Sequence, residues 1–114
     1  MESILTSIKK LLGIAEEYTH FDSDITMHIN SVLMILNQMG VGPEEGFFIE
    51  DASATWEEFI SDITKIQAVK SYVHLKVKLL FDPPLSSAVM EATNRLISEL
   101  EFRLNVAVDP KLSD

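Results

Sequence analysis

The stretch IQAVKSYVHLKVKLLF, from Ile66 to Phe81, decides the fold of this chain. Its apolar residues form two stripes at the helical repeat of 3.6 residues, and together they cover more than half of the helix circumference. A helix this apolar has to be enclosed by other elements on several sides. We therefore predict a central helix over about residues 65–81, ended by the Asp-Pro-Pro of residues 82–84. The two stripes contain Ile66, Val69, Val73, Val77, Leu80 and Ala68, Tyr72, Leu75, Leu79.

Apolar periodicity predicts further helices around this one, over about residues 2–12, 24–39, 55–62 and 87–104. Glycine at position 13 and the Gly-Val-Gly-Pro of residues 40–43 are natural helix ends. Residues 44–54 are the least regular part and predict an irregular loop or a short hairpin. The predicted fold class is all-α, a small bundle of about four to five helices around the central helix.

Capping residues support several of these helix starts. Thr55 and Glu58 have the spacing of a capping box, in which each side chain binds the backbone N–H of the other residue. Asp22 or Ser23 is expected to cap the second helix, and Ser86 or Ser87 the last one. Trp56 and Phe59 should anchor the short helix to the core. The last helix is expected to bury the stripe Val89, Ala92, Leu96, Ile97, Leu100 and Leu104.

The 114 residues, 46% of them hydrophobic, predict one domain with a substantial core. We expect a single helical domain over residues 1–105 and a flexible C-terminal tail over 106–114, since Pro110 prevents the helix from continuing. The chain has no cysteine, so neither a disulfide framework nor a thiolate metal site is expected. The longest uncharged run, residues 25–43, contains His28 and Asn30, which are costly in lipid; no membrane span is therefore expected.

The net charge of −9 is unevenly distributed along the chain. Residues 1–64 carry twelve acidic side chains and two lysines, whereas residues 65–114 carry six acidic and seven basic side chains. This acidic half is either an ordinary solvated face or a surface that repels nucleic acid and pairs with a basic partner. Sequence-specific DNA binding is disfavoured, because no basic patch interleaved with aromatic residues occurs.

Motifs for catalysis are missing from the sequence. The four glycines form no phosphate-binding loop, and no Gly-x-Ser-x-Gly nucleophile motif occurs. The three histidines, at positions 20, 28 and 74, do not have the spacing of a zinc helix motif. Residues 20–24 do not fit a calcium loop, which requires a glycine and a distal glutamate. We therefore expect no enzymatic activity, no cofactor and no metal ligand.

Several apolar side chains are predicted to lie outside the core. Met27 and Met34 are one heptad apart, almost opposite the core stripe of their helix. They are either two half-exposed methionines or part of a second contact surface, since methionine adapts to partner surfaces. Phe47 and Phe48 lie in an acidic loop and either fold back on the core or dock onto a neighbour. Phe102 falls on the polar side of the last helix and is a further contact candidate.

Four segments in this order resemble the head-tail connector, or adaptor, proteins of tailed bacteriophages. The segments are DITMHINSVLMILNQMGVGP (24–43), ATWEEFI (54–60), AVKSYVHLKVKLLFDPP (68–84) and AVMEATNRLISELEFRLN (88–105). The resemblance implies a structural virion protein that forms a homo-oligomeric ring, dodecameric when assembled, under the portal of the capsid. The ring would extend the DNA channel and join the capsid to the tail.

The resemblance also gives the candidate residues a role. Met27, Met34, Phe47 and Phe48 would lie between protomers, and Phe102 with Arg103 would contact the portal or another partner. The implied partners are further copies of the chain, the portal protein, a downstream connector or tail protein, and double-stranded DNA passing through a lumen lined by the acidic half. The protein would then assemble in the host cytoplasm and reside at the head-tail junction of the virion. The alternative is a small monomeric helical module or regulator that binds one partner.

Overall fold

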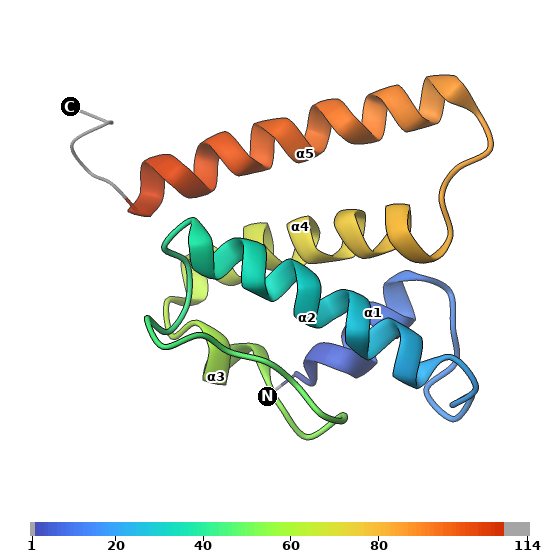
Figure 1. Ribbon diagram of the computed structural model, residues 1–114, viewed down its shortest axis with the longest axis horizontal. Coiled ribbons are helices and arrows are strands. Elements are labelled where there is room, and N and C mark those ends of the chain that lie inside the picture. Colours follow the sequence, from blue (N-terminus) through green and yellow to red (C-terminus); the bar gives the residue numbers. More distant parts are fainter. Residues whose placement is uncertain (1, 109–114) are drawn as a thin grey trace.

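The computed structural model describes residues 2–108, which form five α-helices and no β-strand (Figure 1). The predicted all-α bundle is therefore confirmed, and residues 44–54 form an irregular loop rather than a hairpin. The helices are α1 (Ile4–Leu11), α2 (Asp22–Gln38), α3 (Trp56–Phe59), α4 (Ile63–Phe81) and α5 (Ser87–Val108).

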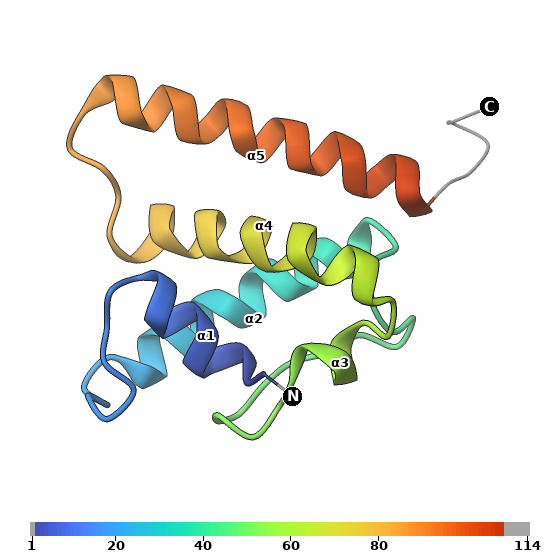
Figure 2. The ribbon, with the colours of Figure 1, turned by 180° about the vertical axis from the view of Figure 1, so that it is seen from behind.

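Helix α4 lies at the centre, as predicted, and packs against each of the other four helices (Figures 1 and 2). Helices α1 and α2 cover one side of it, and α5 runs antiparallel to it along the opposite edge of the molecule. Most of its two apolar stripes is buried or half-buried. Leu80 was predicted to be in the core but is exposed, because the last turn of α4 borders an open groove instead of a packed helix.

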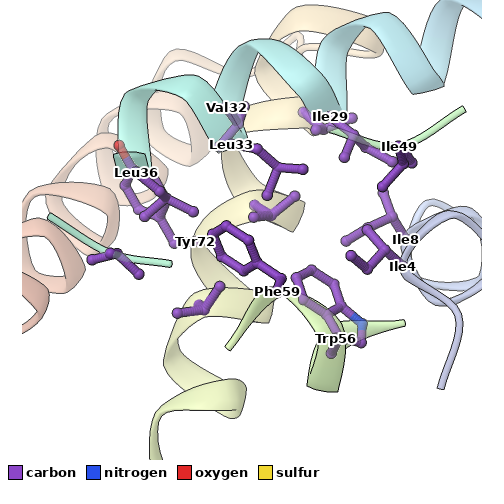
Figure 3. Packing of buried hydrophobic residues seen from close by; sticks show 14 of the residues in the cluster. Ile4, Ile8, Ile29, Val32, Leu33, Leu36, Ile49, Trp56, Phe59 and Tyr72 are labelled. Carbon is purple, nitrogen blue, oxygen red and sulfur yellow. The ribbon is translucent and has the colours of Figure 1, made fainter. Parts of the chain in front are cut away.

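Trp56 is the largest side chain of the core and is fully buried (Figure 3). It packs in one cluster with Ile4 and Ile8 of α1, Leu33 of α2 and Tyr72 of α4. The predicted capping box positions it: Thr55 N–H donates to Glu58 Oε1 (2.8 Å), and Glu58 N–H donates to Thr55 Oγ1 (3.4 Å). The short helix α3 thus serves mainly to place an aromatic anchor between α1 and α4.

Two helix ends use the glycines that the sequence indicates. Gly13 and Gly40 have φ values of +84° and +87°, a conformation that costs glycine little because it has no Cβ. At α1, Ile14 N–H donates to the Lys9 carbonyl; at α2, Val41 N–H donates to the Leu36 carbonyl. Each of these hydrogen bonds joins an N–H to the carbonyl five residues earlier, which is the 6→1 bond of a Schellman motif. The motif turns the chain sharply after each helix.

The start of α2 differs from the prediction. Neither Asp22 nor Ser23 caps the helix: Phe21 occupies the cap position without a side-chain hydrogen bond, and Asp22 is already helical. The carboxylate of Asp22 instead lies 2.8 Å from the ammonium of Lys9, whose side chain is only 3% exposed. Asp22 therefore pairs with α1 and does not cap α2. At the start of α5 the predicted cap is present, because Ser86 Oγ accepts a hydrogen bond from Val89 N–H.

Helix α5 is both longer and less covered than predicted. It continues to Val108, because the first helix-breaking residue after Leu104 is Pro110; residues 105–108 are therefore helical, and the rest of the predicted tail lies outside the described residues. Only Ile97 and Leu104 of its predicted core stripe are buried, whereas Val89, Ala92 and Leu96 are exposed. The reason is that α5 packs mainly on α4, and Figure 1 shows no second helix beside its first half.

Candidate functional site

The outer face of α2 carries two exposed methionines. Met27 and Met34 are 59% and 58% exposed, so both project into solvent opposite the buried stripe of the helix. They line a shallow depression together with Asn30, which lies one turn from each of them. Flexible thioether side chains at this position make the outer face of α2 a candidate contact surface.

Asn30 fixes the 44–54 loop onto α2. Its side-chain amide donates to the Ile49 carbonyl (2.9 Å), and its Oδ1 accepts from Ile49 N–H (2.7 Å). Ile49 itself is buried, so the loop is held by both hydrogen bonds and apolar contacts. The structure thereby brings the loop next to the face that carries Met27 and Met34.

The two adjacent phenylalanines of the loop have different surroundings. Phe47 is half-buried, and its ring lies 5.4 Å from the ring of Phe59 between centroids. Phe48 is 68% exposed and projects away from the core. Of the two, Phe48 is free to contact another molecule, and Phe47 holds the loop in place.

An open groove between α2 and α4 was not predicted. It has a volume of about 390 Å³, and four of its seven lining residues are aliphatic. The sequence holds one signal for it: Ile35 is apolar but lies off the core stripe of its helix. The lining residues are His28, Ser31, Val32 and Ile35 of α2 and Lys76, Leu79 and Leu80 of α4.

The candidate residues of α5 lie on a different surface. Phe102 is 69% exposed, and Arg103 is exposed and paired with Glu99 (2.6 Å). Tyr72 joins α4 to this part of α5, because its hydroxyl donates a hydrogen bond to Glu101 Oε2 (2.8 Å). Burial and the neighbouring carboxylate raise the pKa of Tyr72, so it stays neutral and keeps this hydrogen bond.

The 44–58 segment is strongly acidic. It contains six carboxylates and no lysine or arginine, and all six side chains are exposed. Hydrogen bonds from the Ser53 hydroxyl and N–H lower the pKa of Asp51, which keeps it ionised. Phe48 is therefore an exposed aromatic side chain surrounded by negative charge.

Within residues 2–108 no three acidic or histidine side chains come together as a metal site, and no helix could cross a membrane. Two of the histidines lie in different places: His28 borders the groove, and His74 is on α4. His74 is half-buried, and its Nε2 is shielded from water and has no hydrogen-bond partner among the described residues. Burial, assisted by the charge of Lys78, lowers the pKa of His74 although the nearby Leu11 backbone acts in the opposite direction. The neutral imidazole of His74 thus serves packing.

This pKa shift predicts a pH dependence of stability. The unfolded chain protonates His74 at a higher pH than the folded chain, so the stabilisation is present above about pH 6.5 and is lost as the pH falls through the folded-state pKa. We expect His74→Gln to lose less unfolding free energy than the wild type between about pH 7 and about pH 5. Urea denaturation at each pH measures the difference. The control Ser71→Ala, on the exposed side of the same helix, should follow the wild-type profile; an unaltered profile in His74→Gln would contradict the assignment.

The described residues therefore form a small all-α protein whose distinctive features are exposed apolar side chains and a groove. A family model described as phage connector protein matches residues 4–111, nearly the whole chain, and the chain belongs to this family. No curated protein and no solved structure matches it. Membership assigns the protein a structural role as a phage connector and agrees with the resemblance that the sequence segments suggest.

Proposed function

We propose that this connector forms a homo-oligomeric ring, dodecameric when assembled, at the head-tail junction of the virion. The observation that carries the proposal is the set of exposed apolar side chains on and beside α2, namely Met27, Met34 and Phe48. Large apolar side chains gathered on one face are typical of a protein contact. Family membership supplies the context of an assembled phage particle.

A closed ring of identical protomers needs heterologous contacts, in which one face of the protomer fits a different face of its neighbour. Met27, Met34 and Phe48 would belong to one of these faces. Phe47 would contribute indirectly to the contact between protomers, because its packing against Phe59 holds the loop that carries Phe48. The ring would assemble in the host cytoplasm before it joins the capsid.

The ring would sit under the portal and extend the DNA channel toward a downstream connector or tail protein. Exposed Phe102 and Arg103 would contact the portal from α5, a different helix from the one that carries Met27 and Met34. The acidic side chains of the N-terminal half that lie outside the 44–54 loop would face the lumen, where like charge keeps double-stranded DNA from adhering during passage. The negative charge of the lumen would therefore let DNA pass through the ring without binding to it.

Replacing Met27 and Met34 by glutamate is expected to weaken assembly at least tenfold without unfolding the protomer. Two new carboxylates on this face would have to be desolvated at the contact, and they add to a chain that is already at −9. Sedimentation or light scattering of the Met27→Glu/Met34→Glu variant, alone and with purified portal, measures assembly; circular dichroism measures helicity.

The matched control is Ile63→Glu/Leu85→Glu, which adds the same charge at two exposed apolar positions outside α2. This control should assemble more like the wild type. Full assembly of the Met27→Glu/Met34→Glu variant with normal helicity would show that the α2 face is not between protomers.

A further inference from the structure

We propose that the groove between α2 and α4 receives the Phe48 side chain of the neighbouring protomer. This inference rests on the proposed ring and names both halves of its repeating contact. The projecting half is the 44–54 loop with Phe48, and the receiving half is the groove lined by Val32, Ile35, Leu79 and Leu80.

Phe48 is presented in a fixed position. Its neighbours Phe47 and Ile49 both turn toward the protein, one against Phe59 and the other into the core, so the backbone on each side is held. The two hydrogen bonds between Asn30 and Ile49 fix the loop further. A side chain that is ordered before binding loses less conformational entropy in the complex, and aromatic side chains dominate the energetics of protein contacts.

The groove has the size and chemistry to hold an aromatic ring. Its volume of about 390 Å³ falls in the range of about 300–1,000 Å³ found for pockets that hold small ligands. Its aliphatic residues would bury the ring, and its openness to solvent leaves room for a side chain that enters from another molecule. The exposure of Leu80, at a position with the pattern of a core residue, is explained if a neighbour covers it.

Charge favours a second copy of this chain as the occupant. Lys76 borders the groove and forms no ion pair with any residue of the 2–108 range. The exposed carboxylates that accompany Phe48 in its loop are Glu44, Glu45, Glu50 and Asp51. Insertion of Phe48 would bring this negative loop to the lysine, so apolar contact and charge attraction select the same pairing.

The placement of the two halves on the protomer suits a ring. Asn30, which holds the loop, and Ile35, which lines the groove, lie about 140° apart around α2 by the helical repeat of about 100° per residue. Figure 1 shows the loop on one side of α2 and the last turns of α4 on the other. Because the two halves lie on opposite sides of a protomer, Phe48 cannot enter the groove of its own chain. It can only enter the groove of a neighbouring copy, and repeating this heterologous contact builds a ring.

Disulfide cross-linking tests the pairing cleanly, because the chain has no cysteine of its own. The variant Phe48→Cys/Leu80→Cys, assembled and then oxidised, should give a ladder of covalent oligomers on a non-reducing denaturing gel. Mixing the two single variants should give covalent dimers only, and neither single variant alone should cross-link. The control Phe102→Cys/Leu80→Cys, with a second site as exposed as Phe48, should give no ladder.

A charge exchange provides a second readout. Lys76→Glu should weaken assembly by about threefold to fivefold, and adding Glu50→Lys to it should restore most of the loss. If rings form but the Phe48–Leu80 ladder is absent, the groove is not the receiving face, while the ring itself stands. If the wild-type protein forms no ring, alone or on the portal, the ring proposal fails and this contact fails with it.

Discussion

Trp56→Ala is expected to lower the free energy of unfolding by about 3–5 kcal/mol. The side chain is fully buried between α1 and α4, and its removal leaves a cavity that rigid neighbours such as Ile4, Ile8 and Tyr72 cannot close. The change also removes the hydrogen bond that Trp56 Nε1 donates to Ser7 Oγ (2.8 Å). Because Trp56 is the one tryptophan of the chain, guanidinium denaturation should be followed by circular dichroism rather than fluorescence.

Two further variants separate the contributions to this loss. Trp56→Phe keeps much of the apolar ring but leaves the buried Ser7 hydroxyl without its donor, so it should cost less than the alanine variant. Phe48→Ala removes an exposed ring and should change the free energy of unfolding by no more than about 0.5 kcal/mol. A Trp56→Ala protein as stable as Phe48→Ala would contradict the role of Trp56 as the core anchor.

Lys9→Ala is expected to cost about 3 kcal/mol of unfolding free energy. The ammonium of Lys9 lies 2.8 Å from Asp22 Oδ1 and donates to the carbonyls of Glu16 and Tyr18 (2.9 and 2.8 Å). Its removal takes away the donor to both carbonyls and leaves Asp22 Oδ1, which is shielded from water, without its counter-charge. The lysine thus holds the connection between α1 and α2, and chemical denaturation measures its contribution.

The adjacent lysine is a matched control. Lys10 is exposed, so Lys10→Ala should change stability by no more than about 0.5 kcal/mol although it removes the same charge. Lys9→Met retains most of the aliphatic stem and should remain destabilised, since the ammonium makes the polar contacts. Equal stabilities for Lys9→Ala and Lys10→Ala would show that the buried ammonium does not stabilise the fold.

Local sequence signals predict much of this fold. The apolar stripes of residues 66–81 identify the central helix, because only an enclosed helix tolerates so little polar surface. Thr55 and Glu58 identify the start of α3, and Gly13 and Gly40 identify two helix ends, since each of these signals acts within one helical turn. Met27 and Met34 are exposed, as their position almost opposite the core stripe of their helix predicts.

Features that depend on distant packing could not be predicted in this way. Lys9 lies in the last turn of α1, where a lysine normally stays in solvent and interacts with the helix dipole. The connection that follows α1 instead buries Lys9 beside Asp22. Leu80 and Leu96 continue apolar stripes, yet whether such positions are covered depends on which helix lies beside them. The groove forms where α2 and α4 lie side by side: Ile35 is its one local sign, and the sequence of either helix alone does not place Leu79 and Leu80 beside Ile35.

We expect this connector to assemble into a ring. The most direct test is the mass of the wild-type protein by light scattering after size exclusion, over a concentration series, alone and with purified portal. We expect a closed species at a fixed multiple of the 12.8 kDa protomer mass, either on its own or once portal is present. A mass of one protomer at every concentration, unchanged by portal, would contradict it and favour a monomeric helical module that binds a single partner.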